Sequence, residues 1–419
     1  AGTSDLNDMP SFATPSDGAG TLRVRFGGVE RSCSLAQARG ATSRGDSATL
    51  ELCWDELAPA DPVAPLAKDD AKRVRDELVA ARRAELRTER AAEVEAKVLT
   101  LGDKSLRWLE RSFGDAPEGE RSLWISLHGG GGAPVEVNDG QWKNQIQLYE
   151  PAEGIYVAPR APTDTWNLWH EGHVDPLFAR LIEDFVALRG VDPERVYLLG
   201  YSAGGDGVWQ LAPRIADRFA AAAMMAGHPN EASLLGLRNL PFAIFMGAED
   251  AAYDRNRIAK ERAGELDALR SADADGYEHF VRIYPGLGHW MERKDAEALP
   301  WMADRRRVSW PKRVVWFQDD VVHERFYWLG RATGAARAGE HVVAEVDGQR
   351  VRIDSHGARG LELWLSDELL DLDLPIVVER DGAVVFEGRV PRDPNVLRAE
   401  LARSFDPKLA ACARLSLAD

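Results

Sequence analysis

The sequence has few cysteines, no long apolar run and no excess of positive charge. Three cysteines occur in 419 residues, which is too few for a scaffold held together by disulfides. The separation of Cys33 and Cys53 would allow one disulfide and leave Cys412 over, but we favour free, packed thiols. None of the three lies near the motifs that carry the chemistry discussed below, so a thiol nucleophile is set aside.

The charge balance and the hydropathy pattern exclude two classes of interaction. There are 52 lysine and arginine residues against 68 aspartate and glutamate residues, and the formal net charge is −16. An acidic surface repels nucleic-acid phosphates, and no basic patch is large enough to offset that repulsion. No apolar run reaches the roughly 18 to 20 residues that a membrane-spanning helix needs. We therefore expect no nucleic-acid partner and no transmembrane segment.

Residues 1–20 are rich in serine, threonine, aspartate, proline and glycine, a composition typical of a flexible tether. The sequence begins with Ala1 and not with methionine, so we expect that a leader has been removed. Together these features indicate an exported protein, located in the periplasm, on the cell surface or outside the cell. A cytoplasmic protein with an unstructured start is the alternative.

A chain of 419 residues exceeds one ordinary domain, and further divisions are expected after the tether. Residues 21–117 contain two short strand-like runs, at 21–26 and 48–54, and a long stretch without glycine or proline at 69–98. This stretch is dense in alanine, glutamate, arginine and leucine and predicts a helix. Its larger apolar residues recur at intervals of four or eight and so form one stripe; they are Val74, Leu78, Leu86, Val94 and Val98.

Residues 118–307 alternate apolar strands with helical stretches. The helical stretches include 175–189 and 255–269, and the strand candidates are 122–127, 154–159, 195–200, 219–227, 241–247 and 279–285. Near-continuous apolar runs are typical of strands that helices cover on both faces. The pattern predicts an α/β fold with a doubly wound, mainly parallel sheet.

Residues 308–419 have a different character. They show short segments of alternating polarity with Asp-Gly turns at 347–348 and 381–382, followed by a helical stretch at 395–405. Asp-Gly between alternating segments is the signature of a β-hairpin. This region is predicted to be a small β-rich accessory domain.

A serine between glycines follows one of the predicted strands. Ser202 stands in GYSAGG at residues 200–205, directly after the strand at 195–200, and the residues behind it can begin a helix. A sharp strand-to-helix turn exposes the serine oxygen at the carboxyl edge of the sheet, and glycines are needed where the backbone approaches itself closely. The motif therefore predicts a nucleophile at Ser202.

A serine hydroxyl is a weak nucleophile at neutral pH unless a base removes its proton. Two further loops supply an acid and then a histidine, in the order that this architecture requires. Asp250 follows the strand at 241–247 in GAED, and His289 follows the strand at 279–285 in GLGH. Asp254 lies four residues beyond Asp250 and is the alternative acid. We favour Asp250 because it is closer to the end of its strand.

The glycine run HGGGG at 128–132 directly follows the first strand of this region. Acyl transfer builds negative charge on a carbonyl oxygen, and backbone N–H groups must already point at that oxygen. We expect the amide of Gly130 or Gly131 to be one donor, and the amide of Ala203, the residue after the nucleophile, to be the other. His128 is expected to brace this loop and not to act as a second base.

Taken together, HGGGG, GYSAGG, GAED and GLGH resemble the motifs of the α/β-hydrolase superfamily. The resemblance is greatest to its bacterial phospholipase/carboxylesterase-type members and to its polyester-esterase-like and feruloyl-esterase-like members. It covers the region at 118–307, which is less than half of the chain. It implies a charge network of Ser202, His289 and Asp250, an acyl-enzyme intermediate, and no metal or organic cofactor.

A loop rich in tryptophan and histidine follows the strand at 154–159. Its residues Trp166, Trp169 and His170 are candidates for a pocket wall that would accept an aryl acyl group or a sugar, and plain packing is the alternative. His170 and His173 also form an HEGH pair. No metal is expected there, because no helix fixes the two imidazoles and no third ligand is evident.

Other aromatic and histidine residues also allow two interpretations, substrate contact and plain packing. His228 follows the strand at 219–227 and is a candidate for substrate contact, with a local hydrogen bond as the alternative. Trp209, Trp290 and Trp301 are expected in the core.

These observations predict a serine hydrolase that acts on a carboxylic ester, either a small molecule or an ester linked to a saccharide or polymer. A serine peptidase is one alternative, because the same groups cleave amides. A non-catalytic binding protein is disfavoured, because every catalytic position is occupied. A carbohydrate-binding or adhesion protein led by residues 308–419 is a further alternative. The sequence does not define the oligomeric state.

Overall fold

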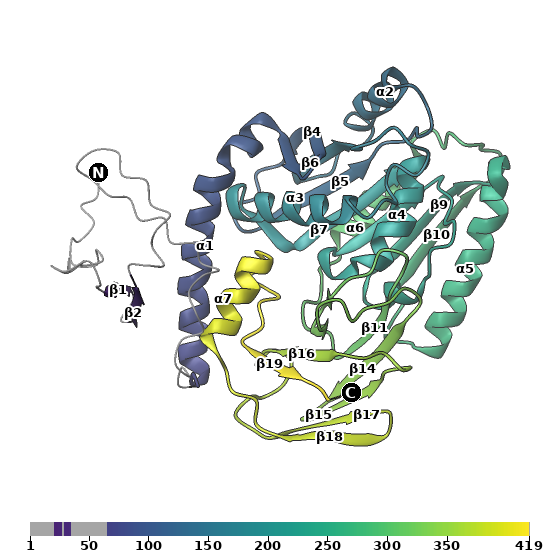
Figure 1. The fold of residues 1–419 in the computed structure, drawn as a ribbon. Helices are drawn as coiled ribbons and strands as arrows, with labels where there is room; N and C mark the ends of the chain where they lie inside the picture. Colours follow the sequence, from purple (N-terminus) through teal and green to yellow (C-terminus); the bar gives the residue numbers. More distant parts are fainter. Residues whose placement is uncertain (1–20, 27–28, 35–64, 419) are drawn as a thin grey trace, which may run out of the picture. The chain divides into compact units, whose positions relative to one another are not determined.

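The computed structural model describes residues 21–26, 29–34 and 65–418 (Figure 1). The chain divides into two compact units, Ala1–Ala64 and Pro65–Asp419. In the first unit, β1 (Thr21–Phe26) pairs with β2 (Val29–Ser34) as an antiparallel hairpin, with Thr21 opposite Ser34. The strand expected at 21–26 is therefore confirmed.

Several expectations for the start of the chain cannot be compared with the structure. The tether at 1–20 and the strand at 48–54 lie outside the described residues. A disulfide between Cys33 and Cys53 would depend on side chains that also lie outside them. Cys412, in the second unit, is a free and buried thiol.

The second unit contains an eight-stranded sheet with the strand order β10-β9-β8-β7-β5-β6-β4-β3. The six strands from β5 to β10 are parallel, β4 is antiparallel to β6, and β3 is antiparallel to β4. Every strand predicted within 118–307 is present. The strands are β3 (Val98–Leu101), β4 (Lys104–Phe113), β5 (Arg121–Leu127), β6 (Gly154–Arg160), β7 (Val191–Tyr201), β8 (Ala221–Met225), β9 (Phe242–Gly247) and β10 (His279–Tyr284).

Helices cover both faces of this sheet. Alternate residues of β5 point to opposite faces, so Leu123 and Ile125 join one hydrophobic cluster and Trp124 joins the other. The first cluster includes residues of α1 (Lys68–Ala96), α3 (Val174–Leu188), α4 (Ala203–Arg214) and α5 (Arg255–Ala272), and the second includes residues of α2 (Val135–Gln145) and α6 (Ala298–Ala303). The doubly wound α/β architecture is thereby confirmed.

The long helix predicted over 69–98 is observed as α1. It ends at Ala96 because Lys97 adopts a left-handed conformation (φ 55°), and Val98 begins β3 instead of continuing the apolar stripe. Both β3 and β4 extend the large sheet, so strand pairing crosses position 117, where the sequence suggested a boundary. The predicted division into domains stays a prediction.

The C-terminal region is rich in strands, as expected. It forms a five-stranded sheet in the order β11-β14-β15-β17-β18 and a four-stranded sheet in the order β12-β13-β16-β19. Asp381 and Gly382 both have positive φ in the β17–β18 hairpin, as an Asp-Gly turn favours. The strands are β11 (Arg313–Phe317), β12 (Arg325–Phe326), β13 (Leu329–Arg331), β14 (His341–Asp347), β15 (Arg350–Asp354), β16 (Leu361–Leu365), β17 (Ile376–Arg380), β18 (Ala383–Gly388) and β19 (Ala413–Ser416).

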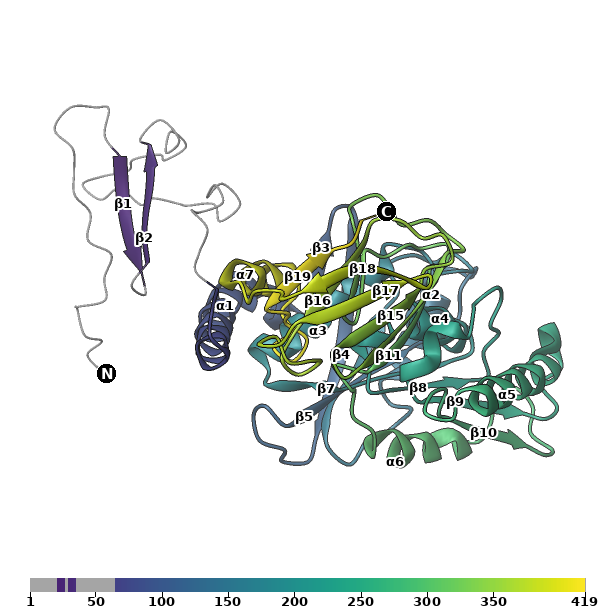
Figure 2. The ribbon, with the colours of Figure 1, turned by 90° about the horizontal axis from the view of Figure 1, so that it is seen from below.

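The C-terminal region is packed against the rest of the unit. Its helix α7 (Pro394–Arg403) lies beside α1 (Figures 1 and 2). Short 3₁₀ turns occur at Ala216–Arg218, Leu235–Asn239, Ala252–Asp254 and Lys294–Glu297. Within the described residues, every helix is too short or too polar to cross a membrane.

A buried ion pair joins the two parts of the second unit. Arg307, at the predicted boundary, donates from Nη1 and Nη2 to the carboxylate of Asp406 at 2.6 and 3.0 Å. Nη1 also donates to the carbonyl oxygen of Asp217 at 2.7 Å. Both side chains of the pair are buried, so loss of one partner would leave an uncompensated charge away from water.

We expect Arg307→Ala to lower the free energy of unfolding by about 3 to 5 kcal/mol, because the buried carboxylate of Asp406 is left without its charged partner. Arg257→Ala is the control. Arg257 pairs with Asp254 and Glu261, but all three side chains are more than half exposed, so its loss is expected to leave the free energy of unfolding nearly unchanged. Urea unfolding measures both, and equal losses would contradict the argument.

Candidate active site

The turn between β7 and α4 holds Ser202 in a conformation that a non-glycine residue rarely adopts. Its backbone has φ 60° and ψ −125°. Its amide donates to the carbonyl oxygen of Met225, and its own carbonyl accepts from the amide of Asp206, at 2.9 and 3.0 Å. A Cβ on Gly200 would overlap the carbonyl of Gly204. The glycines therefore permit the close approach that makes the turn.

A line of two hydrogen bonds connects Ser202 with His289 and Asp250. Nε2 of His289 lies 2.9 Å from Oγ of Ser202, and Nδ1 of His289 lies 2.7 Å from Oδ2 of Asp250. The three side chains come from the carboxyl ends of β7, β9 and β10. Asp250 is buried, while His289 is 43% exposed and so accessible to a substrate.

The structure distinguishes the two candidate acids. Asp254 lies on the surface and pairs with Arg257 at 3.1 Å, whereas Asp250 contacts His289. Arg255 lies 4.0 Å from the other oxygen of Asp250. The carboxylate beside the imidazole is thus the one that the sequence favoured.

Tyr201 fixes the loop that carries His289, and sequence reasoning missed it. Its hydroxyl donates to the carbonyl oxygen of His289 at 2.6 Å and accepts from the amide of Met291 at 2.9 Å. Burial raises the pKa of Tyr201, so the hydroxyl keeps its proton for the bond it donates. The only signal in the sequence is its position directly before Ser202.

The two amides of the glycine loop that were predicted as alternative donors differ in the structure. The amide of Gly131 donates to Oδ1 of Asn138 at 2.9 Å, so the alternative that used Gly131 does not fit. Among the described residues, no hydrogen bond uses the amide of Gly130. Ala203 is the first residue of α4, where an amide has no partner inside the helix. Gly130 and Ala203 are therefore the remaining candidates.

His128 orients the glycine loop. Its Nε2 accepts from the amide of Ala161 at 3.1 Å, so its proton is on Nδ1, which donates to the carbonyl oxygen of Gly129 at 2.6 Å. A trans peptide points its C=O and its N–H in opposite directions. The bond to the Gly129 carbonyl therefore fixes the direction of the Gly130 amide. Burial lowers the pKa of His128 to about 4, and the imidazole stays neutral near pH 7.

The loop at 161–173 divides into a buried and an exposed part. Trp169 is fully buried and donates from Nε1 to the carbonyl oxygen of His128 at 3.0 Å, so its predicted place in a pocket wall does not fit. His170 is also buried, and its carbonyl accepts from Arg214. Trp166 is 64% exposed, lies edge-on to His170 and borders Gly132. Of the three residues of this loop predicted to form a pocket wall, it is the exposed one.

The other predicted aromatic and histidine residues also separate by exposure. His228 is half-buried; its amide donates to Asp206 at 2.6 Å and its Nδ1 accepts from the amide of Asn230. Burial lowers the pKa of His228. Trp209 is in the core, as expected. Trp290 was expected there too, but this was wrong: it is 52% exposed, directly after His289.

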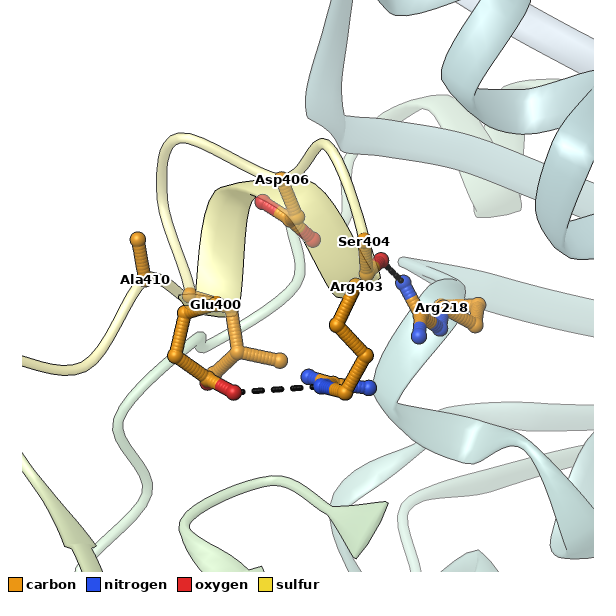
Figure 3. A pocket seen from close by; sticks show the side chains of 7 residues that line it. Arg218, Glu400, Arg403, Ser404, Asp406 and Ala410 are labelled. Carbon is orange, nitrogen blue, oxygen red and sulfur yellow. Dashed lines mark hydrogen bonds and ion pairs between the residues drawn. The ribbon is translucent and has the colours of Figure 1, made fainter. Parts of the chain in front are cut away.

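The described residues contain neither a metal-binding cluster nor, in the cavity beside α7, room for a ligand larger than water. Within the described ranges, no group of three or more histidine, cysteine, aspartate or glutamate side chains is arranged to hold a metal ion. A polar cavity between α7 and the neighbouring 3₁₀ turn is drawn in Figure 3. Arg218 donates to Ser404 there, and Arg403 donates to Glu400. Its volume of about 10 Å³ leaves room for no more than one water molecule.

Residues 158–321 match the model of the Dienelactone hydrolase family, and this span contains Ser202, Asp250 and His289. The chain is 35% identical over 121 residues to a protein named "Putative esterase NocK" from Nocardia uniformis subsp. tsuyamanensis. That match covers 26% of this chain and 34% of the relative, so the chain spans about a third of the relative's length.

Solved structures resemble the chain at the level of the fold. One is a thermostable esterase, with 19% identity and a TM-score of 0.37, covering 50% of this chain and 63% of that one. Another is LpqC, a poly(3-hydroxybutyrate) depolymerase from Bordetella parapertussis. It has 18% identity and a TM-score of 0.36, and the match covers 48% of this chain and 89% of that one.

The buried neutral His128 should make the protein less stable in acid. A histidine whose pKa falls from 6.5 to about 4 on folding binds fewer protons in the folded state between these values. Its contribution to stability is therefore lost as pH falls through that window. The free energy of unfolding should drop by about 2 to 3 kcal/mol more in the wild type than in His128→Asn between pH 7.5 and 4.5. Urea unfolding at both pH values tests this, and equal drops would refute it.

Proposed function

We propose, from the α/β-hydrolase fold of the Pro65–Asp419 unit, that the protein is a serine hydrolase that cleaves carboxylic esters. The observation that carries the proposal is the continuous line of hydrogen bonds from Ser202 through His289 to Asp250. A nucleophile, a base and a group that orients the base are the parts that acyl transfer needs. The matched family and the name of the relative NocK support hydrolysis of an ester.

The reaction follows from the positions of these groups. Oγ of Ser202 attacks the ester carbonyl carbon while Nε2 of His289 takes the hydroxyl proton. Asp250 accepts the hydrogen bond from Nδ1 and stabilises the positive charge on the imidazole. The tetrahedral intermediate collapses, the C–O bond to the alcohol breaks, and the alcohol leaves with the proton from His289. Water then attacks the acyl-enzyme by the same route and releases the acid and Ser202.

Negative charge on the carbonyl oxygen needs donors that are already in place. The amides of Ala203 and Gly130 are proposed for this role, because neither has another partner among the described residues and both lie at the loops beside Ser202. Gly129 supports this placement, since a Cβ built on it would lie 3.1 Å from Cβ of Ser202. Fixed donors of this kind contribute about 3 to 4 kcal/mol each to the lowering of the barrier.

The exposed tryptophans support an apolar or ring-bearing substrate. Trp166 borders the glycine loop, and Trp290 follows His289. Aromatic rings at the entrance of a site stack on aryl groups and on the apolar faces of sugars. An ester with an aryl or saccharide part, free or linked to a polymer, is the proposed substrate class.

The first test is labelling with a fluorophosphonate probe, followed by peptide mapping, on the wild type and on Ser202→Ala. We expect a label on Ser202 and turnover of short p-nitrophenyl esters by the wild type. Ser202→Ala should lose at least about 10³-fold in kcat/KM while keeping its unfolding transition, because the attacking atom is gone. A fully active variant would refute the proposal. Turnover of aminoacyl anilides in preference to the esters would instead favour a peptidase.

The acid is tested by a matched pair of variants. Asp250→Asn should lower kcat/KM by about 10³-fold or more, because the imidazole loses the partner that orients it and balances its charge. Asp254→Asn should stay within about twofold of the wild type, since its carboxylate lies on the surface and pairs with exposed Arg257. Steady-state kinetics on p-nitrophenyl acetate measure both, and the reverse order would show that the assignment is wrong.

A further inference from the structure

Asp206 is a half-buried carboxylate close to the candidate triad that the mechanism above does not use. It lies in the first turn of α4, four residues after Ser202, which caps that helix. Its amide donates to the carbonyl of Ser202 at 3.0 Å. Its Oδ1 accepts from the amide of His228 at 2.6 Å, and His228 belongs to the loop after β8. This contact holds the carboxylate over the carboxyl end of β8.

The strand order places the carboxylate of Asp206 close to the imidazole of His289. In the sheet, β8 lies between β9, which Asp250 follows, and β7, which Ser202 follows. The ring of His289 bridges Asp250 and Ser202. It therefore spans the end of β8, where Asp206 is held. In agreement with this placement, the charges of His289 and Arg255 lower the pKa of the Asp206 carboxyl against the rise that burial causes.

The charges around His289 show what such a carboxylate does. In the described part of the chain, two carboxylates, Asp250 and Asp206, and one cation, Arg255, are ionised groups close to the ring. With both carboxylates ionised, these groups sum to −1 before proton transfer, and protonation of His289 brings the total to zero. Without Asp206, the charges of Asp250 and Arg255 sum to zero before proton transfer. Protonation of His289 then leaves a net positive charge in a partly buried site, which is unfavourable.

The other neighbours do not replace it. His228 presents its backbone amide to Asp206, and burial lowers the pKa of its imidazole, so that ring adds no charge near neutral pH. Tyr201 lies edge-on to His289 and keeps its proton. Nε of Arg255 has no hydrogen-bond partner among the described residues, so this cation is not committed to one carboxylate.

We propose that Asp206 is a positioning residue whose negative charge stabilises the imidazolium form of His289 during the reaction. The proton passes from Oγ of Ser202 to Nε2 of His289 and then to the leaving alcohol; Asp206 neither gives nor takes it. The inference rests on the proposed serine-hydrolase function. It adds a second carboxylate, on the nucleophile's own helix, to the one that contacts the imidazole.

The charge of Asp206 is available only above a certain pH. Burial raises the pKa of Asp206 to about 6, while the His228 amide, Arg255 and His289 oppose that rise. Above about pH 6 the carboxylate is ionised and stabilises the imidazolium. Below that pH it gains a proton and the stabilisation is lost.

The test separates this charge from the hydrogen bond to His228. Asp206→Asn keeps an oxygen that can accept from the His228 amide but removes the charge, whereas Asp206→Ala removes both. Asp254→Asn is the control for loss of one negative charge on the same side of the sheet. The measurement is kcat/KM for p-nitrophenyl acetate from pH 5 to 9, together with the rate of fluorophosphonate labelling of Ser202.

For Asp206→Asn we expect a roughly threefold lower kcat/KM at pH 8, because the imidazolium is less stable. We also expect the acid limb of the profile to move to lower pH by about half a unit, because His289 then loses its proton more easily. Asp254→Asn should change neither. A lower plateau without movement of the limb would assign Asp206 a purely structural role and overturn the proposal, as would a profile that superimposes on that of the wild type.

A measurement that needs no change at Asp206 covers the case in which these variants do not fold. The carboxyl carbon of Asp206, followed by NMR, should titrate near pH 6 in the wild type and at a higher pH in His289→Ala, because the charge of His289 opposes the rise of the Asp206 pKa. An unchanged midpoint would overturn the proposal. If Ser202→Ala remains fully active or the wild type takes no label at Ser202, the serine-hydrolase function fails and this inference fails with it. Loss of activity in Ser202→Ala with an unchanged Asp206→Asn profile removes the inference alone.

Discussion

The close contact of three backbone segments around Ser202 is the constraint on which the rest of the site depends. A Cβ on Gly204 would overlap the carbonyl of Leu127 at the end of β5, and a Cβ on Gly200 would overlap the carbonyl of Gly204. Because glycine has no Cβ, these overlaps do not occur, and α4 begins directly against the central strands. The positive φ of Ser202 costs of order 1 to 3 kcal/mol, and the packed sheet around it supplies the compensation. The hydroxyl is thereby held at the edge where the loops after β9 and β10 bring Asp250 and His289.

Elements decided by local pattern could be predicted from the sequence. The parallel strands are apolar along most of their length because both faces are covered, and that signal is independent of what lies beside them. The order of Ser202, Asp250 and His289 along the chain could also be predicted from the sequence. The addition of β3 and β4 to the sheet was missed because β4 is antiparallel and shows the alternating polarity of a strand that is not fully covered.

Side chains whose role depends on tertiary packing could not be assigned in the same way. Trp169 and Trp290 both lie in loops next to glycines, yet one packs against α4 in the core and the other lies largely in solvent. The amide of Gly131 is occupied because Asn138, on α2, reaches back to it. Nothing in the sequence marks this contact, since asparagine in the first turns of a helix often bonds locally.

The C-terminal region contributes to the site through the loop after β11. His323 contacts the carboxylate of Asp175 at 2.7 Å, and Arg214 of α4 donates to the other oxygen of that carboxylate at 2.6 Å. Arg214 also donates to the carbonyl of His170. One cluster thus ties the β-rich region to the helix that follows Ser202 and to the loop that presents Trp166. Since breaking a buried ion pair is costly, this loop is held in place by Arg214 and, through Asp175, by His323, which lies 148 positions from Asp175 in the sequence. The exposed position of Trp166 is therefore a property of the whole Pro65–Asp419 unit and not of the eight-stranded sheet alone.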